Sequence, residues 1–87
     1  ERTNLKTIIA PHNIVDSEIR NLEKMTQSLS VRYSRIDRDL DPSKKILIID
    51  SVGSLKHLYK FADIAYVGGG TSDFIIYLKQ LYLEYLL

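Results

Sequence analysis

The sequence predicts an α/β fold built on a small parallel sheet that is buried on both faces. Two short apolar runs, residues 46–49 and 64–67, are each followed by a loop rich in serine or glycine. Between them, apolar side chains recur at the spacing of one helical face, at Leu55, Leu58, Tyr59 and Ala62. Strand, helix and strand in this order indicate a βαβ unit, because strands covered on both faces are apolar throughout.

Length and composition limit what the chain can be. Its 87 residues allow at most one small domain with a thin core. A hydrophobic content of 45%, a charged content of 26% and a net charge of +1 are typical of a soluble globular chain and give no reason to expect nucleic acid. Without cysteine there is no disulfide framework, and without paired histidines we expect no metal. The first residues lack both an initiator methionine and a signal peptide, so we expect a piece of a longer protein.

The first half of the chain predicts strand, helix and strand. Residues 5–10 form a strand candidate that Pro11 ends, because proline cannot donate to the ladder. Asn13 is the expected helix cap, and Asp16 lies in the first turn. The apolar residues of the helix share one predicted face: Val15, Ile19, Leu22, Met25 and Leu29. A weak strand follows at 31–33.

Polar residues separate this half from the central unit. Three arginines alternate with aspartates, which indicates a mixed-charge surface: Arg32, Arg35 and Arg38 with Asp37 and Asp39. Residues 41–43 (Asp-Pro-Ser) predict a turn. At the other end of the chain, residues 71–87 predict an apolar helix capped by Ser72 or Asp73. The 14 residues from 74 onward are too few for a membrane span, which needs about 20.

The candidate site lies in the loops that follow the predicted strands. In parallel sheets, ligands sit outside the carboxyl ends of the strands. Gly53 and Ser54 at a helix start offer backbone N–H groups to a phosphate, and Ser51 adds a hydroxyl. A plain loop glycine followed by a serine helix cap is the interpretation that the spacing alone favours, because one glycine is far from a phosphate-binding motif. Gly68, Gly69 and Gly70 bring backbone close to a ligand or form an ordinary loop.

Other polar residues carry weaker signals. His12 follows the first strand and is either a phosphate or carboxylate contact or an exposed loop histidine. His57 is best explained as a helix-surface residue, and Asp50 as a carboxylate that caps the next turn. No serine, histidine and acid have the spacing of a catalytic set, and the glycines do not form a nicotinamide-binding motif. The residues alone therefore predict a nucleotide- or phosphate-binding half-domain.

Three segments resemble the carboxyl-terminal domain of bacterial 3-deoxy-D-manno-octulosonic acid (Kdo) transferases. These are residues 10–12 (Ala-Pro-His), 50–55 (Asp-Ser-Val-Gly-Ser-Leu) and 59–70 (Tyr-Lys-Phe-Ala-Asp-Ile-Ala-Tyr-Val-Gly-Gly-Gly). The resemblance implies a GT-B glycosyltransferase with two Rossmann-like domains, of which residues 1–70 would be half of the second. It also implies transfer of Kdo from CMP-Kdo to a lipid A precursor in lipopolysaccharide synthesis, at the cytoplasmic face of the inner membrane, with peripheral membrane association of the full-length protein.

The resemblance assigns roles to the loops. Pro11 and His12 would contact CMP, and Val52, Gly53 and Ser54 would face the donor phosphate, with no metal or other cofactor. Ser54 replaces a common acidic residue, and His12 a common arginine. The general base and the acceptor site would belong to an amino-terminal domain outside this sequence, so we expect no catalytic residue here and no activity from the fragment alone.

After Gly70 the resemblance stops, because the family's His-Asn and Glu-Ala motif is missing. Suitable synonymous codons for residues 71–81, read two bases later, give Phe-Gly-Phe-His-Asn-Ile-Phe-Glu-Ala-Ala. We therefore hypothesise that the tail, 71–87, is an out-of-frame translation. Two alternatives stay open: a fragment of another GT-B nucleotide-sugar enzyme, and a non-catalytic interaction module that binds through its apolar tail.

Overall fold

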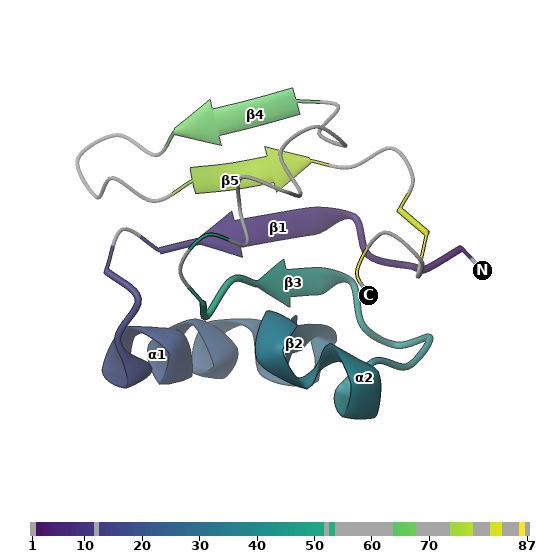
Figure 1. Cartoon of the computed structure of the whole chain (residues 1–87), viewed down its shortest axis with the longest axis horizontal. Coiled ribbons are helices and arrows are strands. Elements are labelled where there is room, and N and C mark those ends of the chain that lie inside the picture. Colours follow the sequence, from purple (N-terminus) through teal and green to yellow (C-terminus); the bar gives the residue numbers. More distant parts are fainter. Residues whose placement is uncertain are drawn as a thin grey trace.

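The computed structural model describes residues 2–11, 13–51, 53, 64–67, 74–77, 81–82 and 86. Strand β1 (Thr7–Ala10) is followed by helix α1 (Asp16–Thr26), the 3-10 turn η1 (Gln27–Leu29) and strand β2 (Ser30–Arg32). A second 3-10 turn, η2 (Tyr33–Arg35), leads into the short helix α2 (Ile36–Asp39) and strand β3 (Ile46–Ile48). Strands β4 (Ile64–Val67) and β5 (Phe74–Tyr77) are the last of the described elements, which Figure 1 shows.

The strands form one sheet in the order β2-β3-β1-β5-β4. β2, β3 and β1 are parallel, and their register places Val31, Leu47 and Ile8 in one row. β5 runs antiparallel to both β1 and β4, so β4 points in the same direction as the three parallel strands. The predicted α/β fold with a parallel sheet is confirmed, and the helix expected between β3 and β4 lies outside the described residues.

The helix predicted over 71–87 is wrong at residues 74–77, which form β5. This segment reads Phe-Ile-Ile-Tyr, and aromatic and β-branched residues favour extended backbone. The space between β1 and β4 also offers backbone hydrogen-bond partners along both edges of β5. Pairing on two sides therefore outweighs a helical pattern that is only local.

Helix α1 begins later than predicted and buries less. Its N-cap is Val15 instead of Asn13, and the Val15 N–H donates to the Asn13 carbonyl at 3.0 Å. Asp16 does lie in the first turn. Of the predicted apolar face, Ile19 is buried and Leu22 partly so, whereas Val15, Met25 and Leu29 are exposed. The helix packs on β3 and β2, and the positive φ of Gln27 ends it before Leu29.

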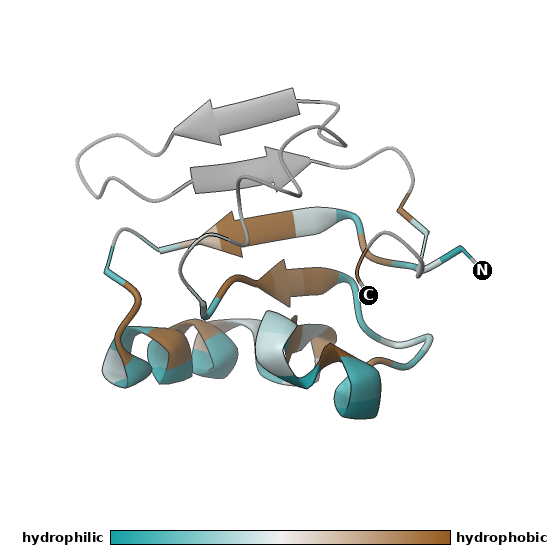
Figure 2. Cartoon of the chain, in the orientation of Figure 1, coloured by the Kyte–Doolittle hydropathy of each residue, from teal (hydrophilic) through white to brown (hydrophobic). Residues whose placement is uncertain are grey.

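The core lies on both faces of the sheet. Inward side chains of β1, β2 and β3 form one cluster with Leu5, Ile36 of α2 and two residues of the tail, Leu81 and Leu86. The opposite face holds Ile48, the register partner of Arg32, and is covered by α1. Figure 2 shows the resulting pattern, with hydrophobic strands β1 and β3 above helices that carry hydrophilic surfaces. Within the described ranges, no helix is long and apolar enough to cross a bilayer.

Candidate functional site

The carboxyl ends of β1 and β3 lie side by side, because the two strands are adjacent and parallel. The Ile49 N–H donates to the Ile9 carbonyl at 2.9 Å, which keeps the strands level at their last residues. Pro11 follows β1, and Ser51 and Gly53 follow β3, so the loops that carry these predicted site residues leave the sheet at neighbouring positions on one edge. His12, Val52 and Ser54 belong to the same loops and lie outside the described residues.

Gly53 has the backbone conformation that glycine favours. Its φ is +91°, a region that side chains with a Cβ rarely adopt, and a Cβ built there would meet no atom within 4 Å. The glycine is therefore required by the turn and not by close packing, and Gly53 itself is exposed. Pro11 is buried, so it shapes its loop through backbone and packing.

The third predicted loop, residues 68–70, follows β4 and lies outside the described residues. Because β4 runs parallel in direction to β1, the carboxyl end of β4 lies at the same edge of the sheet. β5 nevertheless separates β4 from β1, and two strand spacings amount to about 10 Å. The sequence pattern did not indicate this separation, because it does not show which strands pair with one another.

The Asp50 carboxylate accepts two hydrogen bonds from Ser34 in η2, which follows β2. The turn that Asp50 is predicted to cap includes residues 52 and 54, which lie outside the described residues. The Ser34 N–H donates to Oδ1 at 3.0 Å, and the Ser34 hydroxyl donates to Oδ2. The sequence analysis did not identify Ser34. Arg32 of β2 is the register partner of Ile48 of β3, and Ser34 and Asp50 each follow two positions later in the sequence. The contact could be predicted only if the pairing of β2 with β3 were known.

A second polar cluster lies on the α1 face. Arg32 was predicted to be part of a mixed-charge surface, and this is wrong, since its side chain is 11% exposed. Arg32 pairs with Glu23 at 2.6 Å and Asp16 at 3.2 Å, and Asp16 also pairs with Arg20 at 2.9 Å. The hydrogen bond to Glu23 is the main reason why the pKa of Arg32 is raised, and partial burial opposes it. These contacts fasten α1 to the sheet.

A groove of about 470 Å³ runs beside β2. Its lining includes three basic residues and three acidic residues, which are Arg32, Arg38 and Lys44 with Glu23, Asp39 and Asp41. Equal numbers of opposite charges give the groove no preference for an anion. Within the part of the chain that the structure describes, none of the groove's lining residues comes from the loops after β1 or β3.

Two curated proteins are similar in sequence to most of the chain. A 68-residue segment, 76% of the chain, is 35% identical to 11% of a bifunctional glycosyltransferase/methyltransferase from Fusobacterium nucleatum. A 73-residue segment, 83% of the chain, is 33% identical to 16% of a 3-deoxy-D-manno-octulosonic acid transferase from Chlamydophila psittaci. The chain is related to glycosyltransferases. The chain spans only a small part of the length of either relative. No protein-family model and no solved structure matches the chain.

The polar groups of the candidate site limit the kind of ligand that this glycosyltransferase-related chain can bind. Among the described residues, no three histidine or acidic side chains gather as a metal site would require. The described polar groups at the edge formed by β1 and β3 include backbone amides, the Ser51 hydroxyl and the Asp50 carboxylate, which is hydrogen-bonded to Ser34. Amides and hydroxyls bind an anion through hydrogen bonds, so these groups are suited to holding a ligand.

Proposed function

We propose that the chain is part of the donor-binding domain of a Kdo transferase and supplies one side of the site for CMP-Kdo. The observation that carries the proposal is the meeting of the loops after β1 and β3 at one edge of the sheet, fixed by the hydrogen bond between Ile49 and Ile9. The similarity to a protein named as a Kdo transferase supports the choice of donor. Residues 1–70 would form the partial donor domain.

In this proposal the donor phosphate is held by backbone N–H groups of Val52, Gly53 and Ser54 and by the Ser51 hydroxyl, with Pro11 and His12 against the cytidylate. Gly68, Gly69 and Gly70 approach the donor from the far side of β5. Backbone N–H groups stabilise the negative charge that develops on the leaving phosphate when the lipid A hydroxyl attacks the anomeric carbon of Kdo. The hydroxyl's proton goes to a base in the amino-terminal domain, so the fragment alone does not catalyse transfer.

The full-length protein would act at the cytoplasmic face of the bacterial inner membrane, where a lipid A precursor is available as acceptor. This location follows from the proposed substrate and involves peripheral association with the membrane. The tail, residues 71–87, would be an out-of-frame translation of the family's last donor motif. The genomic DNA tests this directly: nucleotides that cannot encode His-Asn and Glu-Ala in the alternative frame contradict it.

A titration of the 15N-labelled chain with CMP, monitored by two-dimensional NMR, tests the donor site. We expect saturable shifts of the amides of Ser51 and Gly53 and of their neighbours, and weaker binding of cytidine, which lacks the phosphate. Shifts confined to the groove beside β2, or no shifts at all, would contradict the proposal. The purified chain should also give no Kdo transfer from CMP-Kdo to a lipid A precursor.

The second candidate function is a fragment of another GT-B nucleotide-sugar enzyme. The same titration distinguishes it from a Kdo transferase fragment. Tighter binding of UDP than of CMP would favour this alternative, because the base and the number of phosphates would then match a different donor. An interaction module that binds through its tail is disfavoured, since Leu81 is fully buried and Leu86 is 4% exposed. Side chains in the core are not available to a partner.

A further inference from the structure

We infer that Asp50 is a positioning residue: through Ser34, it holds the loop after β3 in the conformation that receives the donor phosphate. The inference rests on the proposed function for its ligand, but the loop itself gives an independent readout. Asp50 immediately precedes Ser51, and Gly53 follows two residues later. A restraint on Asp50 is therefore a restraint on the first residue of the candidate phosphate loop.

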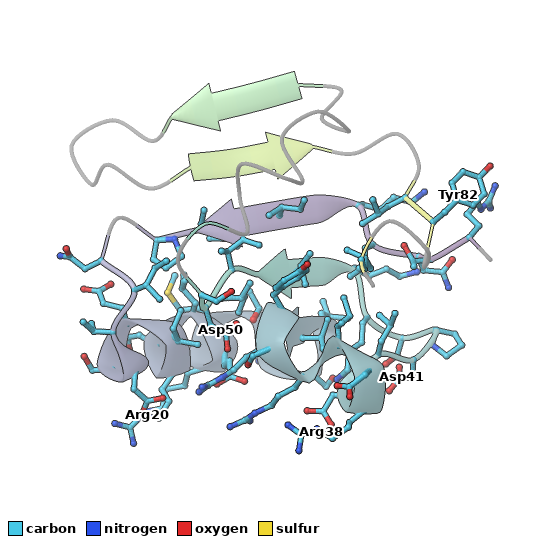
Figure 3. All side chains as sticks on the ribbon, viewed as in Figure 1. Arg20, Arg38, Asp41, Asp50 and Tyr82 are labelled. Carbon is cyan, nitrogen blue, oxygen red and sulfur yellow. The ribbon has the colours of Figure 1, made fainter. Side chains whose placement is uncertain are left out.

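The restraint comes from a neighbouring strand. β2 and β3 are parallel partners with Arg32 opposite Ile48, and Ser34 and Asp50 each lie two residues further along. Both carboxylate oxygens of Asp50 accept a hydrogen bond from Ser34, one from its N–H and one from its hydroxyl. Figure 3 labels Asp50 at the arrowhead end of β3. The pair thus joins the carboxyl ends of β2 and β3, as Ile49 and Ile9 join those of β3 and β1.

Ser34 is itself held firmly. The preceding residue, Tyr33, donates its hydroxyl to the Leu86 carbonyl at 3.3 Å, and the following helix buries Ile36 in the core. η2 is therefore anchored on both sides of Ser34. Since one partner is fixed to the core, the two hydrogen bonds transmit that rigidity to Asp50.

The hydrogen bonds to Ser34 also affect how strongly the negative charge of Asp50 repels a phosphate ligand. A carboxylate beside a phosphate site repels the ligand, and it does so less when it is turned away and hydrogen-bonded elsewhere. Two simple roles for Asp50 then predict opposite results. If only its charge mattered, Asp50→Asn would bind CMP more tightly; if it positions the loop, the same change weakens binding because the amide cannot accept both hydrogen bonds.

The test measures amide hydrogen exchange and CMP binding in the full 87-residue chain. In Ser34→Ala and Asp50→Asn we expect the Gly53 amide to exchange at least about threefold faster and CMP affinity to fall at least about threefold, the size expected for one lost hydrogen bond. Protection of the Ile49 amide, which directly follows β3 and donates to the Ile9 carbonyl, should be unchanged. Ser34→Thr keeps the hydroxyl and the N–H, so its Gly53 amide exchange and its CMP affinity should equal those of the parent chain.

The chain offers a matched control in Asp41 and Ser43, where the same two donors of a serine meet an aspartate at the opposite end of β3. Ser43→Ala should leave Gly53 exchange and CMP affinity unchanged. Unchanged Gly53 exchange in Ser34→Ala, or tighter CMP binding by Asp50→Asn, would overturn the inference. Faster Gly53 exchange in a chain that never binds CMP would support the positioning role and reject the proposed donor.

Discussion

Arg32 of β2 donates two hydrogen bonds to a single oxygen of Glu23 of α1, from Nε at 3.0 Å and from Nη2 at 2.6 Å. The pair joins the helix to the strand that follows it, and Asp16 at the start of α1 adds a third contact to Arg32. One guanidinium thereby fixes both ends of α1 against the sheet. Packing alone does less here, because Ile19 is the buried residue of this helix.

Replacing Arg32 by methionine should lower the free energy of unfolding by about 1–3 kcal/mol, because partly buried Glu23 loses its charged donor. Urea denaturation at neutral pH measures this. Arg38→Ala serves as the control, since Arg38 is 68% exposed and 4.0 Å from Asp37, and its effect should stay within about 0.5 kcal/mol. Equal effects of the two substitutions would contradict a structural role for the Arg32 pair.

Replacing Leu81 by alanine should destabilise the chain by about 2–5 kcal/mol, as expected for a large-to-small change in a core. Leu81 is fully buried, and its carbonyl accepts hydrogen bonds from the N–H and hydroxyl of Thr3. Thermal and urea unfolding followed by circular dichroism give the measurement. Met25→Ala, at a side chain that is 78% exposed, is the comparison; a loss no larger than for Met25 would mean that the tail does not belong to the core.

Replacing Gly53 by alanine should cost about 1 kcal/mol of stability through the backbone alone. A Cβ at this position meets no neighbour, but the φ of +91° is unfavourable for an L-residue. Gly53→Asn should cost less, because asparagine tolerates positive φ better than alanine does. Urea midpoints of the three proteins give the order, and an alanine variant as stable as the parent would show that the turn relaxes freely.

The stability that Ser43 contributes should depend on pH. Hydrogen bonds from the Ser43 hydroxyl and N–H lower the pKa of Asp41, and Lys44 adds to this effect. A lowered folded-state pKa stabilises the fold above the ordinary aspartate pKa of about 3.9, and this is lost as the pH falls through the lowered value. The difference in unfolding free energy between the parent and Ser43→Ala should therefore shrink below about pH 4. A difference that is constant from neutral to acid pH would contradict this assignment.

The parallel strands could be predicted because their signals are local. Residues 46–49 and 64–67 are continuous apolar runs, and Pro11 marks the end of β1. β5 could not be predicted, because the pairing that makes it a strand comes from β1 and β4, which are distant in sequence. Arg32 was misjudged for the same reason: its partners lie on α1, and only the docking of that helix removes the arginine from the surface.

Much of the candidate site follows from one rule about parallel sheets. Knowing that β1 and β3 are parallel and adjacent is enough to bring Pro11, Ser51 and Gly53 to one edge. The rule does not give strand order, so it did not indicate that β5 would lie between β4 and β1. It also did not indicate Ser34, whose link to Asp50 depends on the pairing of β2 with β3.

Thr3 and Leu81 are joined across 78 positions of the sequence, and β1 has β5 as one of its two partners. During synthesis the ribosome releases the chain from its amino end, so β1 emerges long before the strand that will cover its second edge. Completion of this sheet must then wait until translation has passed β5, which ends at Tyr77. Until that moment, chaperones or the ribosome surface have one open edge of a central strand to shield.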